Sequence, residues 1–238
     1  MLMKRFFYLS SVLFAAVLFS GTSRAQSRES IEGNGNMVTK EIPVQSFDEL
    51  TASGVFNVIL QQGSKGQVKI EAEDNLQPLF EVKNEGSVLK ITMKKDINLR
   101  HTKKMNVYVT FKNLKSLNLS SVGNITAEGS LHFDNLKLEN SSVGNVDLDL
   151  SAQKLNVQNN SVGSLTLSGK VDNAVIKSNS VGSIRAGDLV VQVMDIENNG
   201  VGGAEVNAVK ELKVHDSFLG KVKNTGSAAA KKVNRQVI

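Results

Sequence analysis

The carboxylates and histidines are the side chains in this sequence whose types could do chemistry. Some parallel β-helical enzymes cleave polysaccharides with clustered carboxylates, calcium and a basic residue, and the acids to consider here are Asp147, Asp149, Asp172 and Asp188. These four do not share one column of the repeat described below, as a groove of paired acids would require. We therefore expect no catalytic residue and no enzymatic activity.

The sequence contains no recognisable motif for binding a metal ion or a cofactor. The three histidines, His101, His132 and His215, lie far apart in the sequence and lack the spacing of metal ligands. The absence of cysteine excludes disulfides, thiolate metal sites and a cysteine nucleophile. The glycine-rich segment 200–205 lacks the regular acidic positions of calcium-binding nonapeptide repeats. We expect no metal site and no bound cofactor.

The first 25 residues have the pattern of a signal peptide. Lys4 and Arg5 form a basic start, residues 6–19 are apolar, and residues 23–25 offer small side chains for cleavage. An apolar run of about fourteen residues is shorter than the roughly twenty that cross a bilayer. We predict cleavage after Ala25, a mature chain without a transmembrane segment, and a location in the periplasm, on the outer surface or outside the cell.

The charge of the mature chain gives no indication of nucleic-acid binding. The whole sequence has a formal net charge of +5, but three basic residues lie in the predicted signal peptide, which leaves 25 basic against 23 acidic residues. No basic run occurs, and the mature chain has one tyrosine, Tyr108, and no tryptophan. This composition offers few basic groups for phosphate contacts and few aromatic rings for stacking on bases or sugars.

A repeat of about twenty residues is the main signal in the chain. Six pairs of an aliphatic residue and glycine recur with spacings of 21, 19, 19, 20 and 18 residues: Val122-Gly123, Val143-Gly144, Val162-Gly163, Val181-Gly182, Val201-Gly202 and Leu219-Gly220. Apolar residues stand five positions before each pair, at Leu117, Leu138, Val157, Ile176, Ile196 and Val214. Others stand three positions after the aliphatic residue, at Ile125, Val146, Leu165, Ile184, Ala204 and Val222.

This register predicts an all-β fold. Period-two alternation breaks at the valine and resumes after the glycine, so the chain must bend at each pair. Units this short cannot bury an apolar face alone and must stack, with parallel strands about 4.8 Å apart. We predict a parallel β-helix (β-solenoid) with coils of about 20 residues, right-handed because parallel crossovers almost always are. A β-propeller is the competing repeat fold, but its blades need about forty residues.

The segment 37–111 is β-patterned as well and is expected to cap the open end of the stack. Residues 55–60 lead to a turn at 63–66 and then to alternating apolar residues at 68–72. Val82 leads to a turn at 84–86 and then to residues 89–93. Both pairs are interpreted as β-hairpins or as irregular first coils.

Two polar columns precede the valines. Three positions before stand Asn140, Asn159, Ser178, Asn198 and Asp216, and two positions before stand Ser141, Asn160, Asn179, Asn199 and Ser217. They could form a strip that binds a glycan or protein. We favour a structural ladder for the inner column, because parity points it inward and Leu119 occupies it in the first repeat. The glycines are expected to allow positive φ or a close backbone approach rather than to bind phosphate.

The early part of the chain carries a family resemblance. Its residues are Phe47-Asp48-x-Leu50, Ser53-Gly54-x-Phe56-x-Val58-x-Leu60-x-x-Gly63, Val68-x-Ile70 and Asn75-Leu76, and the later Ser-Val-Gly-Asn repeats fit as well. This pattern resembles the head GIN domain of putative auto-transporter adhesins over residues 37–224. The resemblance implies an exported β-helical domain of Bacteroidetes-type bacteria, adhesin-like by architecture, and supplies no catalytic motif.

These observations predict four segments and a ranking of functions. The segments are a signal peptide (1–25), a flexible segment (26–36), a head GIN-like β-solenoid domain (37–224, with Val-Gly repeats in 112–224) and a C-terminal tail (225–238). The favoured function is an exported, non-enzymatic protein that binds a protein or glycan surface. The alternative is a periplasmic or envelope structural module without a small-molecule ligand, for which self-association along its coil edges into a homo-oligomer is one option. A carbohydrate-active β-helix enzyme is the third hypothesis.

Overall fold

The structure is a computed structural model and describes residues 29–232. Within this range the chain is β-structure with one 3-10 helix, η1 (Gln77–Leu79), and no α-helix. The first strands are β1 (Glu29–Glu32), β2 (Met37–Ile42), β3 (Glu49–Gly54), β4 (Asn57–Gln62), β5 (Gln67–Glu73), β6 (Phe80–Glu85), β7 (Val88–Met93), β8 (Ile97–Arg100) and β9 (Asn106–Phe111). The later strands are β10 (Ser116–Ser121), β11 (Ile125–Glu128), β12 (Leu131–Asn140), β13 (Val146–Asn159), β14 (Leu165–Ser178), β15 (Ile184–Asn198), β16 (Ala204–Asp216), β17 (Val222–Asn224) and β18 (Ala230–Lys232).

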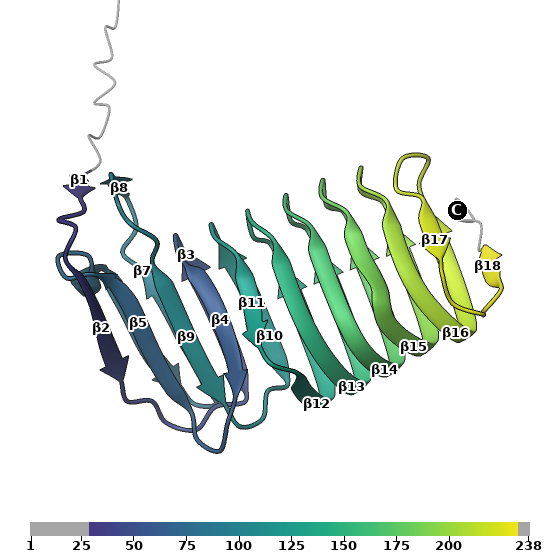
Figure 1. The fold of residues 1–238 in the computed structure, drawn as a ribbon, viewed down its shortest axis with the longest axis horizontal. Helices are drawn as coiled ribbons and strands as arrows, with labels where there is room; N and C mark the ends of the chain where they lie inside the picture. The colour runs from purple at the N-terminus through teal and green to yellow at the C-terminus, as the bar shows by residue number, and fades with distance from the viewer. Residues whose placement is uncertain (1–28, 233–238) are drawn as a thin grey trace, which may run out of the picture.

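All strands except β1 and β8 belong to one sheet of sixteen strands. Eleven of them follow one another in the order β2-β5-β9-β4-β11-β13-β12-β10-β3-β7-β6. Strand β13 connects the two halves of this path. Its first residues pair with β11 and its later residues pair with β12, so the sheet bends from one side of the molecule to the other along β13. The two halves of this path therefore form opposite sides of the molecule, and β14, β15 and β16 extend both sides toward the C-terminus (Figure 1).

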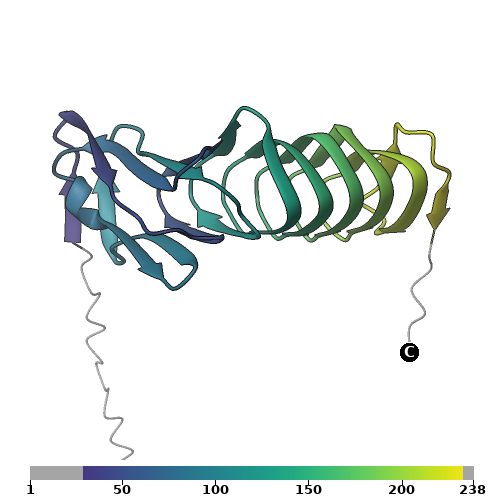
Figure 2. The same cartoon turned by 90° about the horizontal axis from the view of Figure 1, so that it is seen from below.

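The repeats supply the parallel part of this sheet. The column five positions before the valines is in register across neighbouring strands, as in Leu138 with Val157 and Val157 with Ile176. The column three positions after is also in register, as in Leu165 with Ile184. Both columns face the interior and are buried, apart from the half-buried Val222 at the C-terminal end. Figure 2 shows the bent strands curving around this core.

The predicted fold class, a right-handed parallel β-helix, is wrong, because the sheet is mixed. Strand β5 pairs antiparallel with both β2 and β9, and β6 pairs antiparallel with β7. The result is an all-β fold whose sheet curls around the core until it is nearly closed and barrel-like. The spacing of the Val-Gly pairs covers only residues 112–224, so it carries no information on the strand directions of the segment before them.

Of the two segments expected to be hairpins or irregular coils, the first is not a hairpin. Strands β4 and β5 follow each other through the turn at 63–66, but they do not pair, because β9 lies between them and bonds to both. The second hairpin, β6 with β7, has the expected antiparallel pairing from Phe80–Met93 to Glu85–Val88. Gly86, with a φ of +60°, forms its turn in a conformation that favours glycine.

The two ends of the described range contain strands where the sequence indicated loose segments. Within the segment expected to be flexible, β1 pairs in parallel with β8. In the tail, β18 pairs with residues 212–214 of β16. The predicted signal peptide (1–25) lies outside the described residues. No helix within residues 29–232 is long and apolar enough to cross a membrane.

Candidate functional site

The four aspartates considered for catalysis do not meet in one place. Asp147 and Asp149 lie on β13, Asp172 on β14 and Asp188 on β15, and all four are exposed. Only Asp172 lines the groove described below. Across residues 29–232, no group of three or more histidines and carboxylates is arranged to hold a metal ion.

The three histidines are equally dispersed. His101 follows β8 and its Nδ1 lies 3.0 Å from Oε1 of Glu32. His215 on β16 lies 3.7 Å from Oδ1 of Asp195 on the neighbouring strand. His132 on β12 is exposed at one wall of the groove. Each histidine therefore has a different surface environment.

A groove of about 1270 Å³ follows the bend in the middle of β12 to β15, and we call it the bend groove. Its walls are columns of residues from neighbouring strands in register. These columns are His132, Ser151, Lys170 and Val190; Asn135, Lys154 and Asn173; and Lys137, Asn156 and Val175. Because neighbouring strands lie about 4.8 Å apart, the groove offers amide, hydroxyl and ammonium groups at equal steps along the long axis of the molecule.

The bend groove is lined by charged residues of both signs, four lysines and two aspartates, Asp134 and Asp172. Lys115 and Lys137 form ion pairs with Asp48 and Glu139. The other two lysines, Lys154 and Lys170, are exposed and form no ion pair within residues 29–232. They are free to bind acidic groups of a ligand.

An ion pair closes one end of the bend groove. Nζ of Lys115 lies 2.7 Å from Oδ2 of Asp48. The hydrogen bond from Lys115 holds the pKa of Asp48 below its usual value of 3.8, and Asp48 in turn raises the pKa of Lys115 above 10.5. Both groups are therefore charged at neutral pH.

The polar column three positions before the valines points inward, as expected, at Asn140, Asn159, Ser178 and Asn198. The serines directly before the valines, Ser142, Ser161 and Ser180, are buried beside it, and we call these seven residues the inner ladder. Asn140 Nδ2 donates to Asn159 Oδ1 at 2.8 Å, and Asn159 Nδ2 donates to Ser180 Oγ at 3.1 Å. The ladder satisfies its own polar groups inside the core, so it is a structural element and is closed to ligands.

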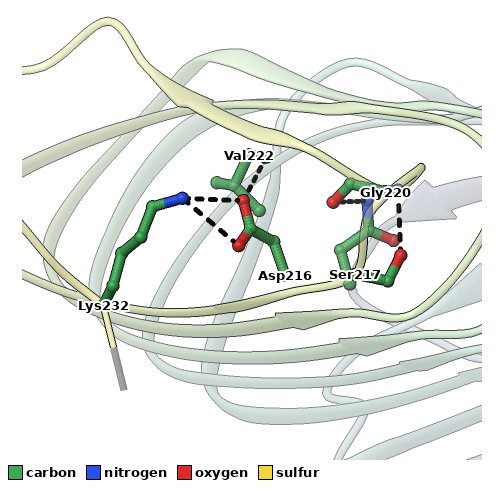
Figure 3. A network of polar contacts seen from close by, with 6 residues as sticks. Asp216, Ser217, Gly220, Val222 and Lys232 are labelled. Atoms are coloured by element: carbon green, nitrogen blue, oxygen red, sulfur yellow. Dashed lines mark hydrogen bonds and ion pairs between the residues drawn. The ribbon is translucent and has the colours of Figure 1, made fainter. Parts of the chain in front are cut away.

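The last member of that column, Asp216, has a different role. Its Oδ2 accepts a hydrogen bond from the backbone N–H of Val222 at 3.4 Å, and Nζ of Lys232 lies 3.4 Å from both of its oxygens (Figure 3). In the adjacent loop the N–H of Gly220 donates to Ser217 Oγ at 2.9 Å. Asp216 therefore joins β16 to the C-terminal tail.

The glycines after the valines are explained by a close backbone approach. A Cβ added to Gly163 would lie 1.9 Å from the carbonyl oxygen of Gly144, and one added to Gly182 would lie 2.2 Å from that of Gly163. Successive bends are thus in direct backbone contact, and glycine is required at these positions. The valines, in contrast, point outward, and Val162 keeps 54% of its surface exposed.

Two features of the surface were missed by sequence reasoning. The stretch of variable length within each repeat marks the position of the bend groove, but its residues do not reveal that this bend is concave. The valines were expected at a bend but not on the surface. They interrupt the period-two alternation of apolar and polar residues, and this interruption could have indicated that they face the solvent. The polar column two positions before them is exposed directly after the ends of β12 to β15, at Ser141, Asn160, Asn179 and Asn199.

Several solved structures resemble this one, whereas no protein with a curated description matches the chain. A putative adhesin from Bacteroides fragilis is 29% identical with a TM-score of 0.73, over 85% of this chain and 100% of that one. A putative adhesin from Parabacteroides distasonis is 23% identical with a TM-score of 0.66, over 86% and 96%. A putative lipid binding protein from the same species is 21% identical with a TM-score of 0.63, over 87% and 100%.

A family model matches most of the chain. It covers residues 46–228, which include β3 to β17, the bend groove and the inner ladder. The matched range begins later than the domain expected from the sequence and ends within the predicted tail. The chain belongs to the family described as putative auto-transporter adhesin, head GIN domain.

Proposed function

We propose that this chain is an exported, non-enzymatic binding protein of the cell envelope whose bend groove holds an acidic oligosaccharide. The groove carries this proposal, because it is a concave surface on which hydrogen-bonding side chains repeat in register over three strands, β12, β13 and β14. Amides and ammonium groups at equal steps suit a linear polymer with regularly spaced hydroxyl and carboxylate groups. Membership of an adhesin-type family supports a binding role.

Two ammonium groups in the bend groove offer contacts to an acidic ligand. Lys154 and Lys170 come from adjacent strands, β13 and β14, and neither forms an ion pair within residues 29–232. Charge-assisted hydrogen bonds to a carboxylate are about twice as strong as neutral ones. Val175, with 39% of its surface exposed, adds an apolar contact for the face of a sugar ring.

Calorimetric titration with an oligogalacturonate tests the groove, with an uncharged galactan oligosaccharide of equal length as the reference ligand. We expect the acidic oligosaccharide to bind and the Lys154→Ala/Lys170→Ala variant to weaken binding by at least about tenfold, which corresponds to about 1.4 kcal/mol. The matched control is Lys40→Ala/Lys210→Ala, which removes two exposed cations outside the groove. Equal losses in both variants would reject the groove as the site.

The same mixtures test the absence of catalysis. The dispersed acids described above lack the paired arrangement of a glycosidase. We expect no new reducing ends and no shortened oligosaccharide after prolonged incubation, measured by mass spectrometry. Shortened products that disappear in an Asp172→Asn variant would favour the carbohydrate-active enzyme instead.

The location of the protein separates the adhesin from the envelope structural module. An adhesin must be reachable from outside the cell, whereas an internal module need not be. Protease digestion of intact cells, beside a lysed control, is expected to remove the protein in both samples. Protection until lysis would reject the surface role and favour the structural module.

A further inference from the structure

A continuous row of exposed aliphatic side chains runs along the Val-Gly bends. Its members, which we call the valine row, are Val55, Val122, Val143, Val162, Val181, Val201 and Leu219, and their exposed fractions range from 46% to 60%. Eleven large hydrophobic side chains are exposed within residues 29–232, and seven of them lie in this row. Backbone bonds align its members, as in the parallel bridge between Val122 and Val143. Monomeric surfaces seldom carry so extended an apolar feature.

The columns directly beside the valine row are uncharged from Val122 to Val201. On one side stand Ser141, Asn160, Asn179 and Asn199, and on the other stand Asn124, Asn145, Ser164 and Ser183. Amide and hydroxyl groups both donate and accept hydrogen bonds, so each column can pair with a copy of itself. A surface built in this way is compatible with its own copy, because no like charges meet at its centre.

The next columns outward are neutral in the repeats of Val122 and Val162 and charged in those of Val143 and Val181, and the order of these charges distinguishes two ways of facing a second copy. Asp147 and Glu139 flank the repeat of Val143, and Arg185 and Lys177 flank the repeat of Val181. If two rows run in the same direction, Asp147 faces the partner's Glu139 and Arg185 faces the partner's Lys177. Both contacts join like charges, so the parallel arrangement is disfavoured.

The opposite direction joins unlike charges instead. With a two-fold axis near Val162, the repeat of Val143 faces the repeat of Val181 in the second copy. Asp147 then faces the partner's Arg185, and Glu139 faces the partner's Lys177. Within residues 29–232 neither Asp147 nor Arg185 forms an ion pair inside its own chain.

We infer that the valine row is the interface of an antiparallel homodimer with its two-fold axis near Val162. The contact is isologous, as in most soluble dimers. The bend groove shares no residue with the row, so both grooves of the dimer stay open.

Sedimentation velocity of the exported chain over a wide concentration range tests this interface. We expect a reversible dimer whose dissociation constant rises at least about tenfold in Val162→Asp/Val181→Asp. These side chains are exposed, so the variant should keep its unfolding free energy, measured in urea. The matched control, Val175→Asp, changes an exposed valine in the bend groove and should leave the dimer intact.

The direction of the two chains is tested by exchanging charges. Asp147→Arg should weaken the dimer, because it places two cations together, and the double variant Asp147→Arg/Arg185→Asp should restore it. In a parallel dimer Asp147→Arg would strengthen association, since it would face the partner's Glu139. A chain that stays monomeric at every concentration, or a dimer indifferent to the valine variants, overturns the proposal.

Discussion

At the scale of single residues, glycine and valine of the same dipeptide have opposite environments. Gly163 lies against the carbonyl group of Gly144, whereas Val162 points into solvent with more than half of its surface exposed. The dipeptide is therefore repeated for two separate reasons. The glycine permits backbone contact between successive bends, and the valine contributes nothing to the core.

Gly163→Ala should be strongly destabilising. Its Cβ would lie 1.9 Å from a backbone oxygen that cannot move away without displacing the neighbouring bend, and overpacking of this kind costs about 1–3 kcal/mol. Urea unfolding measures the effect. Gly187→Ala is the control, because its Cβ would meet only the side chain of Glu205, at 3.5 Å, and should change stability by less than about 1 kcal/mol. An equal loss of unfolding free energy in the two variants would contradict the close backbone contact between Gly163 and Gly144.

The ion pair of Asp48 and Lys115 predicts a pH dependence of stability. The folded state lowers the pKa of Asp48 below 3.8, so its contribution is present above that pH and is lost as the pH falls through the lowered pKa. Lys115, with a raised pKa, keeps its contribution up to about pH 10.5 and loses it above. The stability difference between the wild type and Asp48→Asn should therefore be largest between these limits and shrink below pH 4.

Urea unfolding at several pH values measures that difference. Glu41→Gln is the control, since Glu41 is exposed and forms no ion pair within residues 29–232. Its difference from the wild type should stay nearly constant over the same pH range. A difference for Asp48→Asn that does not change with pH would show that the ion pair is absent in solution.

At the scale of elements, the inner ladder connects β12, β13 and β14 through side chains as well as backbone. Asn159 is its centre, since it accepts from Asn140 Nδ2 and Ser161 Oγ and donates to Ser180 Oγ. Such a network is satisfied only while each strand keeps its register. It therefore favours one alignment of strands whose apolar columns alone would also permit a shift by two residues.

Asn159→Leu should destabilise the protein, even though Leu119 occupies the same column in the first repeat. The substitution leaves the buried Nδ2 group of Asn140 without its partner, at about 1–3 kcal/mol, whereas Ser161 Oγ keeps its hydrogen bond to the carbonyl oxygen of Gly163. Thermal or urea unfolding measures the loss. Asn160→Ala, at the exposed neighbouring position, should stay within about 0.5 kcal/mol of the wild type. Equal stability of Asn159→Leu would mean that the ladder is dispensable.

The sequence predicts the repeated elements well and their surroundings poorly. The buried columns follow from alternation between apolar and polar residues, and the family follows from the string around Phe47 to Gly63. The pairing of β9 between β4 and β5 could not be predicted, because it joins segments about fifty residues apart and depends on a choice among equally apolar strands. The bend groove depends on the angle of a bend, which no single residue type determines.

At the scale of the whole molecule, the equal repeats imply that length can change in whole units. Deletion of residues 164–182 removes 19 residues, joins Gly163 to Ser183 and lets β13 face β15. We expect a folded protein of lower stability that is shorter by about 4.8 Å. Circular dichroism and small-angle scattering measure fold and length.

A deletion of half a unit is the control for this experiment. Removing residues 164–173 would place the apolar column of one strand against the polar column of the next, because it breaks the register of the repeats. This variant should fail to fold. A whole-unit deletion that also fails would show that the repeats are not interchangeable.

The C-terminal edge has a consequence for solubility. Strand β16 is covered by β17 at residues 204–206 and by β18 at residues 212–214, and between them Asn224 and Thr225 bond to its backbone. A protein that stopped before Val222 would keep nearly all of its core, yet its last long strand would offer a row of unpaired amide and carbonyl groups. Such an edge is a template for fibre growth, so the short tail acts as the protein's safeguard against polymerisation.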